Sequence, residues 1–185
     1  MTIKQTMALQ KSRKLEREAL KGYALRILSG RGLSLNELRE KLRQRAAKAP
    51  DIDTVIGDLK EYGFINDQQF AENFASSRLD SRGFGKQRVL SDLLKRRVAP
   101  KVAESAVSGA FEGVDELALI EQFLERKYRN KDLPALLQDP KQLASVYRRL
   151  RAAGFSSGPS IRILKRFAQQ AEELESLEEP ETGGT

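Results

Sequence analysis

Apolar residues recur at helical spacing along nearly the whole chain, and this pattern restricts the fold more than any other feature. They stand three and four positions apart, so each set would line one face of an α-helix. No run alternates β-branched and polar residues as a half-buried strand would. We therefore expect an all-α fold. The sets are Leu35, Leu38 and Leu42; Ile52, Val55, Ile56 and Leu59; Phe70 and Phe74; Leu90 and Leu94; Leu117, Ile120, Leu124 and Tyr128; Leu143, Val146 and Leu150; and Ile161, Leu164 and Phe167.

The apolar pattern also repeats at long intervals. The repeated pairs are Leu38 with Leu42, then Leu90 with Leu94 after 52 residues, then Val146 with Leu150 after a further 56. Each pair lies in a basic segment with another helical segment on either side, which predicts three tandem units of three short helices. A unit of roughly 50 residues is close to the lower limit of independent stability, so neighbouring units would share apolar faces. Coincidental spacing in an ordinary helical protein is the alternative.

This pattern predicts a division of the chain into five segments. We expect a basic N-terminal segment, three repeats and an acidic tail that is disordered because it is polar and contains Pro180 and two adjacent glycines. The predicted bounds are 1–19, 20–66, 67–113, 114–171 and 172–185.

Several helix ends are marked by local signals. Ser34 followed by Glu37 is a capping box, in which each residue satisfies a backbone amide of the first turn. Asp139 precedes Pro140, which is well tolerated at the first helical position. Asp67 is expected to cap the helix that carries the paired phenylalanines.

Three glycines each precede a phenylalanine, in Gly63-Phe64, Gly83-Phe84 and Gly154-Phe155. A glycine in the left-handed conformation often closes a helix, and the apolar residue after it packs back on the last turn. These pairs therefore predict three helix ends, with the phenylalanines in or beside the core rather than free for stacking on bases.

The composition excludes several kinds of chemistry. The chain has no Cys and no His, which excludes disulfides, zinc sites built from those residues, and serine–histidine or cysteine–histidine catalysis. Its longest aliphatic runs are about four residues, against the roughly 20 that a membrane-spanning helix needs. The N-terminus does not look like a secretory signal. We expect a cytoplasmic protein without cofactor, metal or membrane contact.

The charge is strongly uneven. The chain carries 33 basic and 26 acidic residues, a net charge of +7, but six of the glutamates stand in residues 172–185. The rest of the chain has a net charge of +13, since it holds all 33 basic residues and 20 acidic ones. Such a basic body predicts a polyanion or an acidic protein surface as partner.

Two stretches are almost purely basic, residues 82–101 with Asp92 as the only acid and residues 141–166 with none. Solvated helices usually mix charges for i, i+4 pairing, so these stretches predict an electrostatic contact with phosphate or an acidic protein. The alternative is that these basic residues form a solvated surface that binds no partner. The predicted contact residues are Arg82, Lys86, Arg88, Lys95, Arg96, Arg97, Arg148, Arg149, Arg151, Lys165 and Arg166.

Two other functions remain open from the residues alone. Basic second helices could act as helix-turn-helix units of a sequence-specific transcription regulator, although Lys86, Gln87 and Arg88 offer little for reading bases. Asp51 and Asp53 could serve a metal-dependent nuclease, but carboxylates at a helix start also favour the helix dipole.

The order and spacing of several motifs resemble the RecX family of recombination regulators. The motifs are ALRIL at 24–28, SLNELREKL at 34–42, GFINDQQFA at 63–71, RGFGKQRVLSDL at 82–93 and RLRAAGFSSGPSI at 149–161. The resemblance covers about residues 20–168. The family often has Lys-Gly after the second helix of a unit, where this chain has Arg96-Arg97, so the turn there departs from the family pattern.

The resemblance implies an elongated, curved body of three tandem three-helix repeats. It implies a non-enzymatic regulator, most simply a monomer, that binds the RecA recombinase filament in its groove and inhibits ATPase, strand-exchange and co-protease activity. A role in homologous recombination, DNA repair and the SOS response would follow. DNA, single- or double-stranded, would be bound weakly and without sequence preference.

Overall fold

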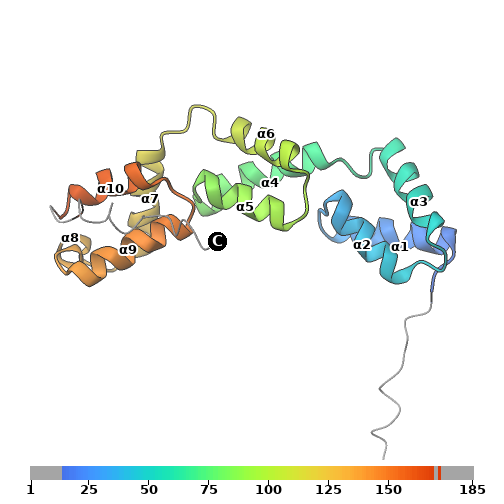
Figure 1. Cartoon of the computed structure of the whole chain (residues 1–185), viewed down its shortest axis with the longest axis horizontal. Helices are drawn as coiled ribbons and strands as arrows, with labels where there is room; N and C mark the ends of the chain where they lie inside the picture. The colour runs from blue at the N-terminus through green and yellow to red at the C-terminus, as the bar shows by residue number, and fades with distance from the viewer. Residues whose placement is uncertain (1–13, 169–170, 172–185) are drawn as a thin grey trace, which may run out of the picture.

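The computed structural model describes residues 14–168 and residue 171. This part of the chain contains ten α-helices and no β-strand, and its one isolated bridge joins Leu15 to Ala46. Figure 1 shows the helices as an elongated, bent row of three groups. The all-α fold of tandem helical units predicted from the apolar spacing is confirmed.

The first group of helices comprises α1 (Arg17–Gly30), α2 (Leu35–Arg45) and α3 (Pro50–Glu61). Their apolar faces meet in one core, whose fully buried side chains are Leu20, Ala24, Leu38, Leu42, Val55 and Leu59.

The second group comprises α4 (Asp67–Arg82), α5 (Lys86–Lys95) and α6 (Pro100–Ala110). Its core is built largely from small side chains, which allow α4 and α6 to approach closely; the buried residues are Ala71, Ala75, Val89, Leu93, Val98, Ala103, Ala106 and Val107.

The third group comprises α7 (Glu116–Tyr128), α8 (Leu133–Leu137), α9 (Pro140–Ala152) and α10 (Ser157–Lys165). The short helix α8 is an addition to the three that the repeat predicted; Asp132 caps it and Leu137 is fully buried. Phe155 is also fully buried, with its ring edge-on to Phe123 at a centroid distance of 5.4 Å.

The three cores contain different buried residues, and each draws them from a single stretch of the chain. No buried residue of the described chain belongs to two cores. Two partly buried side chains, Phe84 and Phe111, pack against both the second and the third core. We retain 20–66, 67–113 and 114–171 as a proposed division of the chain on this basis. The predicted acidic tail 172–185, and residues 1–13 of the predicted basic segment, lie outside the described residues.

The structure corrects the register of the repeat. Val89 and Leu93 are fully buried, as Leu38 and Leu42 are, whereas Leu94 is 42% exposed. Equivalent core positions are therefore separated by steps of 51 and 57 residues, to Val89 and Leu93 and then to Val146 and Leu150. The expected steps of 52 and 56 were wrong by one residue, because α5 carries two adjacent apolar pairs and both fit the helical spacing.

Two of the three predicted helix caps are confirmed. Ser34 and Glu37 form the full capping box of α2, and Asp139 accepts the Lys141 amide at the start of α9. The prediction for Asp67 was wrong, because Asn66 caps α4 instead. Asp67 is then free to accept the amide of Leu35, at 2.6 Å, from the preceding group of helices.

The three glycines before phenylalanine all have positive φ: 72° at Gly63, 56° at Gly83 and 92° at Gly154. The predicted left-handed helix ends are therefore confirmed. Their phenylalanines differ, since Phe155 is fully buried but Phe64 is 56% exposed, so the expectation that Phe64 packs in the core was wrong.

Candidate anion-binding surface

The joint between the first two groups of helices depends on Arg96, at the end of α5. Its Nε donates to Glu37 Oε1 at 3.1 Å and its Nη2 to Glu37 Oε2 at 2.8 Å. Nη2 also donates to the carbonyl of Gly32 at 2.9 Å, and the guanidinium lies 4.6 Å from the centroid of the Phe70 ring. The charge of Arg96 is thus directed into the molecule, not toward a partner.

Backbone carbonyls at the end of α5 complete this joint. The hydroxyl of the buried Ser34 donates to the carbonyl of Arg96 at 2.6 Å. The side-chain amide of Asn36 donates to the carbonyl of Arg97 at 2.8 Å. The C-terminus of α5 therefore faces the N-terminus of α2, an orientation in which the two helix dipoles attract.

The environment of Glu37 follows from these contacts. Partial burial alone would raise the pKa of its carboxyl group. Hydrogen bonds from Arg96 and from the Ser34 amide, with the positive charges of Arg96 and Arg31, outweigh burial and lower the pKa below its usual 4.5. Glu37 is therefore held ionised in the joint.

The joint between the second and third groups has the same plan. The amide of Gly85, at the start of α5, donates to the carbonyl of Ala153 at 2.9 Å, and the amide of Gln87 donates to the carbonyl of Gly154 at 3.2 Å. A Cβ on Gly85 would lie 2.3 Å from the carbonyl of Gly154. The second helices α9, α5 and α2 thus stand end to end, as the row in Figure 1 suggests.

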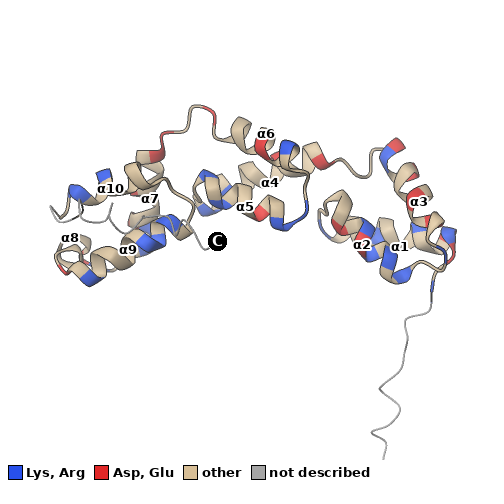
Figure 2. Cartoon of the chain, viewed as in Figure 1, with Lys and Arg blue, Asp and Glu red and all other residues tan. Residues whose placement is uncertain are grey.

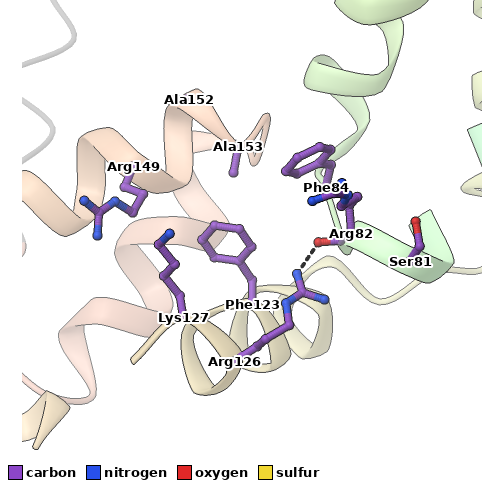
Figure 3. A pocket seen from close by; sticks show the side chains of 9 residues that line it. All are labelled: Ser81, Arg82, Phe84, Phe123, Arg126, Lys127, Arg149, Ala152 and Ala153. Carbon is purple, nitrogen blue, oxygen red and sulfur yellow. Dashed lines mark hydrogen bonds between the residues drawn. The ribbon is translucent and has the colours of Figure 1, made fainter. Parts of the chain in front are cut away.

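A pocket of about 480 Å³ opens beside this second joint. Figure 3 shows Phe123, Arg126 and Lys127 on α7, facing Phe84 and Arg82 across it, with Arg149 on α9 nearby. Arg126 donates to the carbonyl of Arg82. The pocket is lined by Ser81, Arg82, Phe84, Phe123, Arg126, Lys127, Arg149, Ala152 and Ala153.

Four cationic side chains and no carboxylate line this pocket. Sequence analysis had singled out Arg82 and Arg149, which the fold brings to it from segments far apart in the chain. It missed Arg126 and Lys127, because Glu116, Glu121 and Glu125 make their segment look like an ordinary mixed-charge helix.

Other predicted contact residues are engaged within the chain. Arg88 pairs with Asp92 at 3.1 Å, Arg97 with Glu40 at 3.5 Å, and Arg166 with Glu121. Arg151 donates to the carbonyl of Phe155. Lys165 is exposed on the last turn of α10.

Three further predicted residues are exposed and form no ion pair with any described side chain: Lys86 and Lys95 on α5, and Arg148 on α9. In Figure 2, α9 and α10 carry basic residues and no acidic ones, whereas α2 and α3 carry both acidic and basic residues. Lys86, Lys95 and Arg148 are therefore predicted contact residues that remain exposed, and without an ion pair to the described chain, on the second helices of the second and third groups.

Known proteins provide an independent comparison. The family model "RecX, second three-helix domain" matches residues 66–107. A regulatory protein RecX from Chromohalobacter salexigens is 34% identical over 132 residues, which are 71% of this chain and 82% of that protein. The chain belongs to the RecX family. A relative from Caldanaerobacter subterraneus is 27% identical over 113 residues, and the match spans 57% of its length.

Solved RecX structures share the fold of this RecX-family chain. The crystal structure of RecX from Lactobacillus salivarius superposes with a TM-score of 0.61 at 20% identity, covering 83% of this chain and 97% of that one. A second RecX crystal structure also gives a TM-score of 0.61, at 18% identity.

The acidic residues considered for a nuclease have cationic partners in this RecX-family chain. Asp51 accepts from Arg17 at 3.3 Å and Asp53 pairs with Arg39. The described residues contain no group of three or more carboxylates placed to hold a metal ion. Among the described helices none is both long and apolar enough to cross a membrane.

Proposed function

We propose that this RecX-family regulator binds the RecA recombinase filament and inhibits its ATPase, strand-exchange and co-protease activities. It would do so by binding alone, without catalysing a reaction. It would act in the cytoplasm, as a monomer, during recombinational DNA repair and the SOS response. Family membership supports the partner. The observation that carries the proposal is a set of exposed cations without an ion pair to any described residue, Lys86, Lys95 and Arg148, on the second helices of the second and third groups of an elongated helical row.

An elongated row suits a filament because it can span several subunits. Each contact of an exposed lysine or arginine is weak, but contacts linked in one chain add up by effective concentration. DNA held by the filament would contribute phosphate contacts that do not depend on base sequence.

The alternative, a sequence-specific helix-turn-helix regulator, fits the geometry poorly. A recognition helix reads bases with the residues of its N-terminal turn. The N-terminus of α5 lies against the Gly154 turn, and that of α2 lies against the end of α5. Both ends are therefore covered by neighbouring groups of helices. Competition between random and selected duplexes should reveal no sequence preference, and a strong preference would favour the alternative.

The decisive experiment is the ATPase rate of RecA on single-stranded DNA, titrated with this protein. Wild type should inhibit, and the triple variant Lys86→Glu, Lys95→Glu and Arg148→Glu should inhibit several-fold less. A matched control reverses three cations of the first group, in Arg26→Glu, Lys41→Glu and Lys60→Glu. Absence of inhibition by wild type would refute the proposal. Equal loss in both variants would refute the assignment of the contact to the second and third groups, because inhibition would then follow net charge alone.

A further inference from the structure

The pocket at the second joint has a counterpart at the first joint. This counterpart measures about 490 Å³ and is likewise lined by cationic and aromatic residues without a carboxylate. Its lining residues are Arg31, Gly32, Phe70, Asn73, Phe74, Ser77, Arg78 and Arg96.

The two pockets are built from equivalent positions. Arg31 and Arg82 lie 51 residues apart, which is the step that relates the first two repeats. Arg31 directly follows α1, the first helix of its repeat, and Arg82 is the last residue of α4, the first helix of the next repeat. On the next repeat, Phe74 with Arg78 corresponds to Phe123 with Lys127 after 49 residues. The buried pairs Ala71 with Ala75 and Ile120 with Leu124 fix that correspondence, since they are also 49 residues apart. The same cationic pocket is therefore repeated at both joints.

Both pockets lie along one side of α4. Ser77 and Arg78 line the first pocket, and Ser81 and Arg82 line the second. Residues four apart share a helix face and are separated by about 6 Å along the axis. A line of hydroxyl and guanidinium groups thus connects the two joints.

Four of the charges that line these pockets form no ion pair with any described residue, whereas Arg96 at the first pocket is paired with Glu37. The four are Arg31, Arg78, Arg82 and Lys127. The guanidinium of Arg78 lies 4.8 Å from the centroid of the Phe74 ring. This cation–π contact positions the guanidinium and leaves its positive charge unneutralised.

We propose that the two joint pockets bind the phosphodiester backbone of one nucleic-acid strand, which crosses both joints along α4. Guanidinium groups match phosphate oxygens with paired hydrogen bonds, and serine and asparagine side chains commonly add phosphate contacts. A pocket repeated along one helix matches a ligand whose charge also repeats. The surface of a single protein subunit has no such close and regular repeat of charge.

The site has a structural consequence because each pocket takes residues from two groups of helices. A bound strand would connect all three groups and hold them in one relative orientation. The inference rests on the DNA contact in the proposed function but needs no RecA, so it can be tested separately.

The test measures binding of the full chain to a fluorescent oligo-dT strand and to a duplex of equal length, by anisotropy over a range of salt concentrations. The variants are Arg31→Ala with Arg78→Ala at the first pocket, and Arg82→Ala with Lys127→Ala at the second. Lys60→Ala with Lys101→Ala removes the same charge away from both pockets. Arg78→Lys tests for rescue, and circular dichroism confirms that every variant is folded.

Each pocket variant should lower the slope of log K against log salt by about 1.4 for the single strand, since each lost phosphate contact contributes about 0.7. The control pair should leave the slope close to wild type, and Arg78→Lys should retain it. A matching loss with the duplex would also support a backbone site, and the ratio of affinities identifies the preferred form.

Equal losses in the pocket variants and the control would overturn the proposal, because binding would then follow net charge alone. Pocket variants that bind DNA normally but fail to inhibit RecA would overturn it as well, in favour of an acidic protein surface as the occupant. Failure of wild type to inhibit RecA refutes the proposed function but leaves the DNA result intact.

Discussion

Arg97 and Gly154 occupy equivalent positions at the two joints, 57 residues apart, and both have left-handed backbone, with φ of 61° and 92°. The carbonyl of each accepts a hydrogen bond from the preceding repeat, from the side chain of Asn36 at the first joint and from the amide of Gln87 at the second. Arg97 is the only described residue other than glycine with a positive φ. The joint therefore requires this backbone conformation more than it requires the arginine side chain.

Arg97→Gly should stabilise the chain by about 0.5–1 kcal/mol, because a left-handed residue with a side chain costs about 1–2 kcal/mol and the extra flexibility of glycine offsets part of the gain. The lost contact to Glu40 joins two well-exposed side chains at 3.5 Å and contributes little. Urea denaturation measures the change. Gly154→Ala is the opposed control, since its Cβ would lie 2.2 Å from the amide nitrogen of Arg88. Destabilisation by Arg97→Gly would contradict the equivalence of the two joints.

Gly85→Ala should weaken the second joint. The new Cβ would lie 2.3 Å from the Gly154 carbonyl, so the Gly154 turn and α5 must separate. We expect a loss of about 2–3 kcal/mol, typical of a backbone clash, together with faster hydrogen exchange at the Gln87 amide. Gly22→Ala is the matched control, because nothing lies within 4 Å of its added Cβ and alanine favours the helix. Unchanged exchange at Gln87 would argue against the close approach.

Ser34 serves both α2 and the first joint. Its hydroxyl accepts the Glu37 amide at 3.1 Å and donates to the Arg96 carbonyl at 2.6 Å while fully buried. Ser34→Ala should therefore cost about 2 kcal/mol, more than a simple cap, since two buried partners lose a hydrogen bond. Ser156→Ala gives the comparison, because Ser156 stands at the start of α10 without a side-chain cap. Equal losses at the two serines in thermal unfolding would refute the double role.

Local features of the fold could be predicted from the sequence because their causes lie within a few residues. The capping box of Ser34 and the left-handed glycines each depend on one turn of chain. The exact register of the repeat could not be predicted, since Val89 and Leu90 are both apolar and only packing decides which one is buried. The choice of Asn66 over Asp67 as cap likewise depends on Leu35, which lies 32 residues away from Asp67.

The candidate surface was harder to predict than the fold. A basic stretch shows that cations are near each other in sequence, but it does not show which of them find a carboxylate. Arg96 meets Glu37 across 59 residues, and Arg126 reaches the Arg82 carbonyl across 44. The step of 51 residues from Arg31 to Arg82 was visible in the sequence, and a correct register would have pointed to both pockets.

The first joint should also respond to pH through Glu37. Its pKa is lower in the folded chain than the usual 4.5, because hydrogen bonds from Arg96 and Ser34 outweigh the effect of burial. A carboxyl with a lowered folded pKa contributes stability that is fully present above its unfolded pKa and is lost as pH falls through the folded pKa. The contribution of Glu37 should therefore be constant near neutral pH, begin to fall near its usual pKa of 4.5, and be lost as pH falls further through the lower folded pKa.

The measurement compares the free energy of unfolding of wild type and Glu37→Gln from about pH 7 to about pH 3, a range that spans the titration of the carboxyl group. Wild type should be more stable near neutral pH, and the two curves should converge in acid as protonation removes the charge-assisted bond to Arg96. Glu61→Gln is the control, because Glu61 is exposed at the end of α3 and forms no ion pair with any described residue, so its curve should run parallel to wild type. In an Arg96→Met background the stabilising effect of Glu37 should shrink, since the hydrogen bonds and the positive charge of Arg96 no longer oppose the effect of burial on its pKa. An effect of Glu37→Gln of unchanged size and pH dependence in that background would show that Arg96 is not its cause.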